Sequence, residues 1–234
     1  IVGMEAHTYK FEGGGAAVLG SIQPQPVVHA EDGTLPLERI AAVVKPVDPH
    51  FARTRLLALE NTWHGRPLPL EYLRDTHDLA RTHGLGMHLD GARLFNAAVA
   101  CKVPAREIAR HFDTVSICLS KGLGTPVGSV LVGSHALVDK ARRWRKVCGG
   151  GWRQAGILAA AGLHALDHHV ARLQQDHDRA ARLAEGLRGI TGIDLLGQHT
   201  NMVFIDVPAD RLRALDAHLR DAGIRISIGY LPTL

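Results

Sequence analysis

Short apolar runs alternate with amphipathic stretches along much of the chain. The apolar runs lie at residues 55–59, 85–89 and 114–118, and each is followed by polar residues. Residues 69–83 and 104–111, which separate these runs, repeat apolar side chains with the period of a helix. Alternation of this kind is typical of parallel strands joined by helical crossovers, so it predicts an α/β fold.

A further apolar run predicts a mixed sheet. Residues 129–132 follow the run at 114–118 after a glycine-containing turn that is too short for a helical crossover. We therefore expect this strand to pair antiparallel. The expected architecture is a mostly parallel mixed sheet flanked by helices.

Helical patterns cover much of the remaining sequence. We predict a helix from Thr34 to Lys45, with Thr34 as its N-cap, and another that begins after Ser134 as its cap. A long helical region is expected from Trp152 to about Leu187.

The last part of the chain predicts a β-α-β unit. Its strands are expected at residues 201–207 and 224–228, with a helix at 209–222 between them. We therefore expect a large domain over residues 1–165 and a smaller α/β domain over residues 166–234.

Composition and charge narrow the possible partners. Of the 234 residues, 46% are hydrophobic and 21% are charged, as in ordinary soluble proteins. No apolar stretch approaches the roughly 20 residues of a membrane helix. The net charge of +4 is small and its charges are interspersed, so we expect neither a membrane nor a nucleic-acid partner. Three widely spaced cysteines without a CxxC pair fit a reducing cytoplasm.

Polar residues follow three of the predicted strands, namely Glu60-Asn61, Asp90 and Lys121. Ligands of parallel α/β sheets bind at the carboxyl ends of strands, so these residues are candidates for a site. Lys121 also opens the glycine-rich turn at residues 122–126. An ammonium shielded by apolar strand residues would lose hydration, which favours the free amine that attacks a carbonyl. We predict that Lys121 forms a Schiff base.

Asp90 precedes Lys121 by about the length of one βαβ step. An aspartate opposite a Schiff-base lysine is the arrangement that pyridoxal phosphate enzymes use, because the carboxylate keeps the ring nitrogen protonated. Arg93 would reach the phenolate oxygen of the cofactor or a substrate carboxylate. Each residue also has an ordinary interpretation: Asp90 as a helix cap, Lys121 as a surface lysine and Arg93 as one half of a surface ion pair.

Several longer motifs occur in one order along nearly the whole chain. They are Glu5-Ala6-His7, Glu60-Asn61-Thr62, residues 89–96, residues 120–129, Arg143-Trp144-Arg145-Lys146, residues 149–154 and Thr200-Asn201-Met202. In this set and order, they resemble the low-specificity threonine aldolases. The resemblance implies a pyridoxal phosphate enzyme of the aspartate aminotransferase fold, also called fold type I.

The resemblance implies a role for each matching residue around the cofactor. Lys121 would hold the cofactor as a Schiff base, and Asp90 would bind its pyridine nitrogen. Arg93 would bind its ring oxygen or the substrate carboxylate, and His7 would stack on the ring. A loop histidine without a task is the plain alternative for His7.

The same resemblance implies an activity and an assembly. The activity is the cleavage of L-threonine or L-allo-threonine to glycine and an aldehyde, the reaction of a carbon-carbon lyase. Arg153 and Lys146 would help with the phosphate or with closing the site. The enzyme would be a homo-oligomer, a dimer of dimers whose subunits share residues between active sites.

The chain departs from the family pattern after the strand at residues 55–59. Related enzymes often have a histidine after Glu-Asn-Thr, but Trp63 takes that place here and His64 follows it. The base that accepts the substrate hydroxyl proton would be His64, His7 or a water held by the phosphate, and the sequence leaves these alternatives open.

The resemblance also implies segments that lie outside this chain. Family members carry an N-terminal Ser-Gly-Thr loop that holds the phosphate and a C-terminal arginine that binds the substrate carboxylate. The match begins after the first and stops before the second, so we expect truncation at Ile1 and at Leu234. Two alternatives remain: another fold type I enzyme, such as a β-eliminating lyase or a serine hydroxymethyltransferase-like protein, and a noncatalytic fragment.

A metal site is not expected. His164 and His168 stand four residues apart on a predicted helix, a spacing that can chelate zinc. No HExxH motif or nearby acidic ligand accompanies them, so an exposed helical face is the better interpretation.

Overall fold

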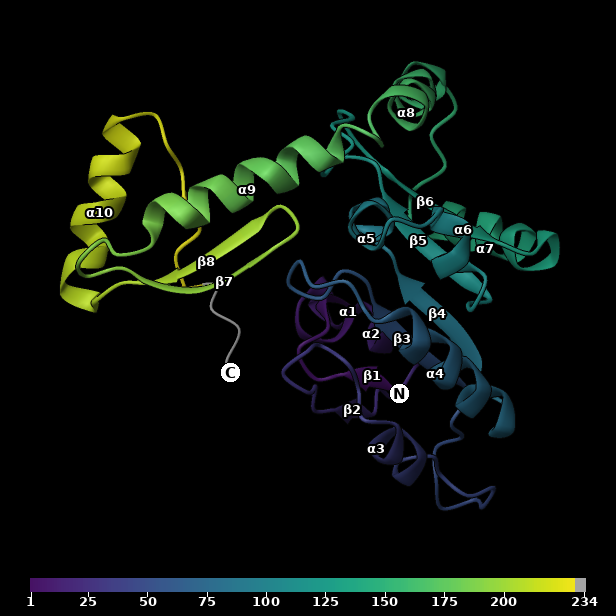
Figure 1. Ribbon diagram of the computed structural model, residues 1–234. Helices are drawn as coiled ribbons and strands as arrows, with labels where there is room; N and C mark the ends of the chain where they lie inside the picture. Colours follow the sequence, from purple (N-terminus) through teal and green to yellow (C-terminus); the bar gives the residue numbers. More distant parts are fainter. Residues whose placement is uncertain (230–234) are drawn as a thin grey trace.

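The computed structural model describes residues 1–229 and has the α/β architecture that the sequence predicts (Figure 1). The central sheet has four strands in the order β3-β4-β5-β6. Their bounds are Leu56–Glu60 for β3, Gly86–Asp90 for β4, Thr114–Cys118 for β5 and Ser129–Gly133 for β6. The first three strands are parallel and β6 is antiparallel to β5, which confirms the predicted mixed sheet.

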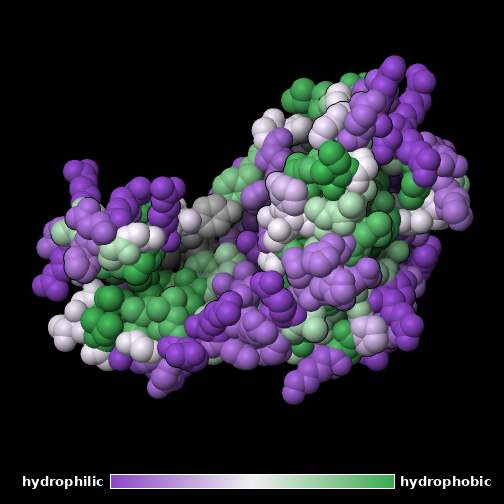
Figure 2. All heavy atoms as spheres, turned by 90° about the horizontal axis from the view of Figure 1, so that it is seen from above, coloured by the Kyte–Doolittle hydropathy of each residue, from purple (hydrophilic) through white to green (hydrophobic). Residues whose placement is uncertain are grey.

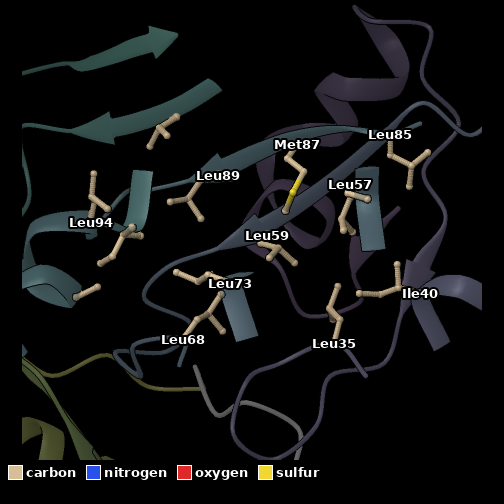
Figure 3. Packing of buried hydrophobic residues seen from close by; sticks show 14 of the residues in the cluster. Leu35, Ile40, Leu57, Leu59, Leu68, Leu73, Leu85, Met87, Leu89 and Leu94 are labelled. Atoms are coloured by element: carbon tan, nitrogen blue, oxygen red, sulfur yellow. The ribbon is translucent and has the colours of Figure 1, made fainter. Parts of the chain in front are cut away.

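Side chains alternate between the two faces of this sheet. Leu57 and Leu59 of β3 and Met87 and Leu89 of β4 are buried, and Figure 3 shows them packed in one cluster with side chains from the flanking helices. Glu60 occupies an alternate position at the end of β3, so its side chain does not enter this core. The alternation along the strands therefore places these four side chains in the core and Glu60 on the opposite face.

A further prediction concerns this core. Leu89 is 0% exposed, so Leu89→Ala should lower the free energy of unfolding by about 2–5 kcal/mol through lost transfer energy and a cavity. Val47→Ala is the control, because Val47 is 85% exposed. This substitution should change the free energy of unfolding by about 0.5 kcal/mol or less. Urea unfolding followed by circular dichroism measures both. Equal midpoints for the two variants would contradict the packing described here.

Helices cover the sheet and connect its strands. They are α3 (Leu37–Ala42), α4 (Leu70–Thr82), α5 (Leu94–Cys101) and α6 (Ala105–Ala109). The helices predicted at 69–83 and 104–111 correspond to α4 and α6, whereas α5 was not predicted.

The predicted helix from Thr34 to Lys45 is wrong at its ends. The helix α3 begins after Pro36, because Thr34 is drawn away by two hydrogen bonds to Asp32 Oδ1, at 2.9 Å from its N–H and 2.7 Å from its hydroxyl. The main chain of Leu35 donates to and accepts from the Tyr72 hydroxyl, both at 2.9 Å. These bonds hold residues 34 and 35 outside the helix.

The helices after the sheet are α7 (His135–Val147), α8 (Gly156–His168) and α9 (Leu173–Leu187). Ser134 caps α7 as predicted, since its Oγ accepts from the Leu137 N–H at 3.4 Å. The single long helical region is wrong, because the chain turns between α8 and α9. The turn lets Ala165 and Leu173 pack into one small core with Leu119 and Leu123. Within the described residues, no helix has both the length and the apolar character needed to cross a membrane.

The last described part contains the strands β7 (Asp194–His199) and β8 (Met202–Asp206) and the helix α10 (Ala209–Asp221). It lies at the far end of α9 from the central sheet (Figure 1). The predicted strand at 224–228 is wrong, because these residues form no strand and β8 pairs antiparallel with β7 instead. The expected end of the chain, Tyr230 to Leu234, lies outside the described residues.

The N-terminal region adds a small parallel pair, β1 (Val2–Gly3) and β2 (Pro26–Val27). Between them lie α1 (His7–Lys10), the 3-10 turn η1 (Glu12–Gly14) and α2 (Gly15–Val18). The N–H of Ala58 donates to the Ile1 carbonyl at 3.0 Å, which attaches this region to β3. His7 is thereby placed next to the carboxyl end of the sheet.

Candidate active site

The strand register brings two carboxyl groups side by side. Glu60 and Asp90 are paired residues at the carboxyl ends of the parallel strands β3 and β4. The electrostatic neighbours of Glu60 are Asp90, Arg93 and Lys121. The structure therefore brings together the predicted residues Asp90, Arg93 and Lys121, and it places Glu60 among them.

Asp90 is fixed by a tight turn after β4. Its side chain is 9% exposed, and its Oδ1 accepts the Ala92 N–H at 3.0 Å. Gly91 lies against β5, where a Cβ atom would stand 2.8 Å from the Ser116 carbonyl oxygen. A larger residue would push the turn away from the sheet, so the glycine after Asp90 keeps its carboxylate at the strand end.

Arg93 is the N-cap of α5 and offers an unused donor. Its Nε is buried and has no hydrogen-bond partner among the described residues. A buried guanidinium nitrogen without an acceptor costs free energy unless a ligand supplies one. Arg93 is thus suited to bind an anionic oxygen beside Asp90.

Lys121 occupies an anchored turn, although its own side chain is exposed. The expectation that apolar strand residues shield this amine is wrong for the described chain, because it is the flanking Leu119 and Leu123, at 9% and 3% exposure, that turn inward. The carbonyl of Leu123 accepts a hydrogen bond from His169 Nδ1 at 2.7 Å. The lysine is therefore presented by a rigid turn and points out of it.

His7 begins α1 and is tied to the sheet by its main chain. Its N–H donates to Glu60 Oε2 at 2.7 Å, although the two residues are 53 positions apart. Its ring is 4.9 Å from the ring of Phe11, and its Nε2 lies 3.0 Å from Glu12 Oε1. The backbone of His7 is thus fixed at the strand ends, while its partly exposed ring contacts residues of its own segment.

Glu60 has the most perturbed acidity of the carboxyl groups in this site. Its pKa is raised to about 7, chiefly by burial and to a smaller extent by the neighbouring Asp90. The His7 N–H, Arg93 and Lys121 oppose this rise. Sequence reasoning used Glu60 only as part of a motif. The available signal was its place at the strand end, next to Asp90.

Trp63 and His64 take different positions after β3. Trp63 is 6% exposed, and its ring stacks on His29 with centroids 4.8 Å apart. His64 adopts φ 46°, and its Nε2 is buried without a hydrogen-bond partner among residues 1–229. Burial lowers the pKa of His64, and the charge of Arg93 contributes to the same shift. Of the two residues, His64 is the one that has Arg93 among its electrostatic neighbours.

A distant hairpin holds the loop that carries His64. Thr200, in the turn between β7 and β8, donates its hydroxyl to the Gly65 carbonyl at 2.8 Å. Arg66 Nε donates to His199 Nε2 at 2.9 Å. Gly65 has φ 81°, and a Cβ there would stand 2.6 Å from the His199 carbonyl oxygen. Only glycine fits this close approach.

Arg153 and Lys146 lie elsewhere on the surface. Lys146 is in the last turn of α7, and its side chain lies against Gly151 in the loop that leads to Arg153. Both residues are exposed, and within the described part of the chain no hydrogen bond or ion pair joins them to the strand ends. Their roles in phosphate binding or closure stay predictions.

Comparison with known proteins identifies the family. A family model described as "Beta-eliminating lyase" matches residues 1–210. The chain belongs to the beta-eliminating lyase family. Within the family, it is 55% identical over 227 residues to the low specificity L-threonine aldolase of Escherichia coli, and it is 45% identical over 236 residues to a probable low-specificity L-threonine aldolase of Arabidopsis thaliana. These alignments cover 97% of the chain in both cases and 68% and 66% of the two relatives.

Solved structures show the same fold. A putative L-allo-threonine aldolase from Listeria monocytogenes superposes with a TM-score of 0.81 at 24% identity, over 97% of this chain and 63% of that one. The threonine aldolase of Leishmania major gives 0.76 at 21% identity, over 92% and 65% of the two chains. The chain therefore spans about two thirds of the length of the proteins it matches. The predicted fold class and family are confirmed.

The residues of this beta-eliminating lyase family member fit pyridoxal phosphate. The cofactor presents a pyridine nitrogen, a phenolate oxygen and an aldehyde, which call for a carboxylate, a cationic donor and an amine. Asp90, the unpartnered Nε of Arg93 and the exposed amine of Lys121 are these three groups, and all are neighbours of Glu60. The donor set of the site thus matches the group that the sequence predicts.

Proposed function

We propose that the protein containing this chain is a pyridoxal phosphate-dependent aldehyde-lyase that cleaves L-threonine and L-allo-threonine to glycine and an aldehyde. The observation that supports it most is the gathering of Asp90, Arg93 and Lys121 around Glu60 at the strand ends. The 55% identity to an enzyme named low specificity L-threonine aldolase supports the substrate class.

Different residues of the chain would bind different groups of the cofactor. The chemistry supplied by bound pyridoxal phosphate is an electron sink for the pair released when the Cα–Cβ bond breaks. Lys121 holds the cofactor covalently, and the carboxylate of Asp90 keeps a proton on the pyridine nitrogen. Arg93 donates to the ring oxygen or to the substrate carboxylate. His7, whose main chain is held at the strand ends, would stack its ring on the cofactor.

Bond cleavage also requires a base for the β-hydroxyl proton. His64 is the better candidate in this geometry, because its Nε2 is buried, unpartnered in the described chain and close to Arg93. Burial lowers the pKa of His64, which favours the neutral imidazole that accepts a proton. The ring of His7 is less suited to this role, because its Nε2 already lies 3.0 Å from Glu12 Oε1.

The proposal extends to assembly, location and the remaining residues. Hydrophobic side chains are exposed over several elements (Figure 2), and Val130, Leu131 and Val132 of β6 are 40%, 42% and 41% exposed. Apolar surface of this extent is typical of subunit contacts, which supports a homo-oligomer. Its arrangement as a dimer of dimers is what the family resemblance implies. Arg153 and Lys146 would assist phosphate binding or closure in that assembly. The free thiols fit the cytoplasm.

The domain division belongs to the same proposal. Residues 1–165 would form the cofactor-binding domain and residues 166–234 part of the smaller domain. The position of β7, β8 and α10 beyond α9 supports this division (Figure 1).

Product analysis tests the activity. The purified protein, incubated with pyridoxal phosphate and L-threonine, should release glycine and acetaldehyde in equal amounts, and the same should hold for L-allo-threonine. A mixture without the cofactor is the control. Ammonia and a keto acid without glycine would assign the site to β-elimination. If added pyridoxal phosphate gives no visible absorbance band with the protein, the chain does not bind the cofactor and is a noncatalytic fragment.

A further inference from the structure

Glu60 is a partly buried titratable group at the strand ends that the proposed chemistry does not use. It ends β3, directly beside Asp90 in the register of the sheet. Its Oε2 accepts the His7 N–H at 2.7 Å across 53 positions of sequence. Arg93 and Lys121 complete its charged surroundings. Every charged or hydrogen-bonding neighbour of this carboxyl group is thus a predicted site residue.

The hydrogen bond to His7 replaces a missing helix cap. The helix α1 has only four residues, and its N-cap residue Ala6 has no side chain that could bond to it. The first N–H groups of a helix lack partners within the helix and need an acceptor from outside. Glu60 supplies that acceptor for His7. Without it, the start of α1 would lose its attachment to the strand end.

The charge of Glu60 matters as much as its position. Two carboxyl groups on adjacent strand ends repel each other when both are ionised, and burial penalises the charged form of a carboxyl group. Burial raises the pKa of Glu60 to about 7, and Asp90 adds to the rise, whereas the His7 N–H, Arg93 and Lys121 limit it. Below that pH the group is neutral, and above it a second negative charge stands beside Asp90.

We propose that Glu60 is a positioning residue that fixes the main chain of His7 at the cofactor site and places a carboxyl group beside Asp90. The inference rests on the proposed function, since it assigns Glu60 to the same site. Lys121 is among the charged neighbours of Glu60, and a nearby carboxylate favours the protonated form of the nitrogen that would join Lys121 to the cofactor. Above neutral pH the ionised Glu60 should therefore help to keep a proton on that nitrogen.

Two variants separate position from charge. Glu60→Gln keeps an oxygen that accepts the His7 N–H but removes the charge, and Glu60→Ala removes both. Glu107→Gln is the matched control, because Glu107 pairs with Arg110 at 2.9 Å on the surface of α6. All three are compared with the unchanged protein.

Amide hydrogen exchange measures the positioning without any cofactor. In Glu60→Ala the His7 amide should exchange about tenfold faster, which corresponds to the loss of one hydrogen bond. In Glu60→Gln and Glu107→Gln its protection should stay close to that of the unchanged protein. An unaltered His7 amide in Glu60→Ala would overturn the positioning role.

The visible spectrum measures the charge effect. With pyridoxal phosphate added, the pH midpoint of the lysine-bound cofactor band should fall by about one unit in Glu60→Gln, since a neighbouring negative charge is lost. It should not move in Glu107→Gln. An unmoved midpoint in Glu60→Gln would overturn the charge role. If the unchanged protein forms no band, the proposed function fails, whereas the exchange experiment still decides the role of Glu60 in holding His7.

Discussion

Replacing Lys121 with alanine should abolish the visible cofactor band and reduce the release of glycine from threonine by roughly a thousandfold or more. Lys121 is an electrostatic neighbour of Glu60 and lies in a turn with buried leucines on both sides. Its side chain is exposed, so the substitution removes the reactive group and little packing. Absorbance spectra with added pyridoxal phosphate and a glycine assay measure the two effects.

Lys102→Asn is the control for the loss of a lysine. Lys102 is exposed at the end of α5 with φ 56°, a conformation that asparagine accepts. Its band and activity should match those of the unchanged protein. Thermal unfolding should give the same midpoint for Lys121→Ala and the unchanged protein without cofactor. A Lys121→Ala protein that keeps its band would show that another amine binds the cofactor.

Asp90→Asn should reduce activity by about 10²–10³-fold, as expected when one fixed electrostatic partner of the reacting group is removed. Asparagine has the shape of aspartate and still accepts the Ala92 N–H, which lies 3.0 Å from Oδ1. The substitution therefore removes the negative charge that would hold a proton on the pyridine nitrogen. The measurement is the rate of glycine release at saturating pyridoxal phosphate.

Asp75→Asn provides the matched control, because Asp75 is an exposed residue of α4 paired with its neighbour Arg74 at 2.9 Å. It should leave the rate unchanged. A slow Asp90→Asn enzyme that still forms the cofactor band and unfolds at the usual temperature would locate the defect in the chemical step. Full activity in Asp90→Asn would contradict the assignment of Asp90 to the active site.

The sheet could be predicted because its strands carry their own signal. The runs at 55–59, 85–89 and 114–118 are apolar at alternate positions that meet one core, and the residues after them come together because parallel strands end at one edge. The short connection before β6 fixed its direction. Asp90, Arg93 and Lys121 could therefore be placed in one site from the sequence.

Other features depend on contacts between distant residues. The strand predicted at 224–228 has the right composition, but β8 takes β7 as its partner, and a strand cannot form without one. The break between α8 and α9 follows from the packing of Leu173 with Leu119 and Leu123. No local pattern shows that the carboxyl group of Glu60 meets the N–H of His7.

The contacts of Gly65 and Arg66 with the β7-β8 turn have a consequence for motion. Thr200 and His199 bind this loop from 135 and 133 residues further along the chain. The segment that carries His64 is thus clasped by a hairpin that lies beyond α9 (Figure 1). A displacement of that hairpin relative to the sheet would break these two hydrogen bonds or move the loop with it, so the position of His64 depends on residues far along the chain.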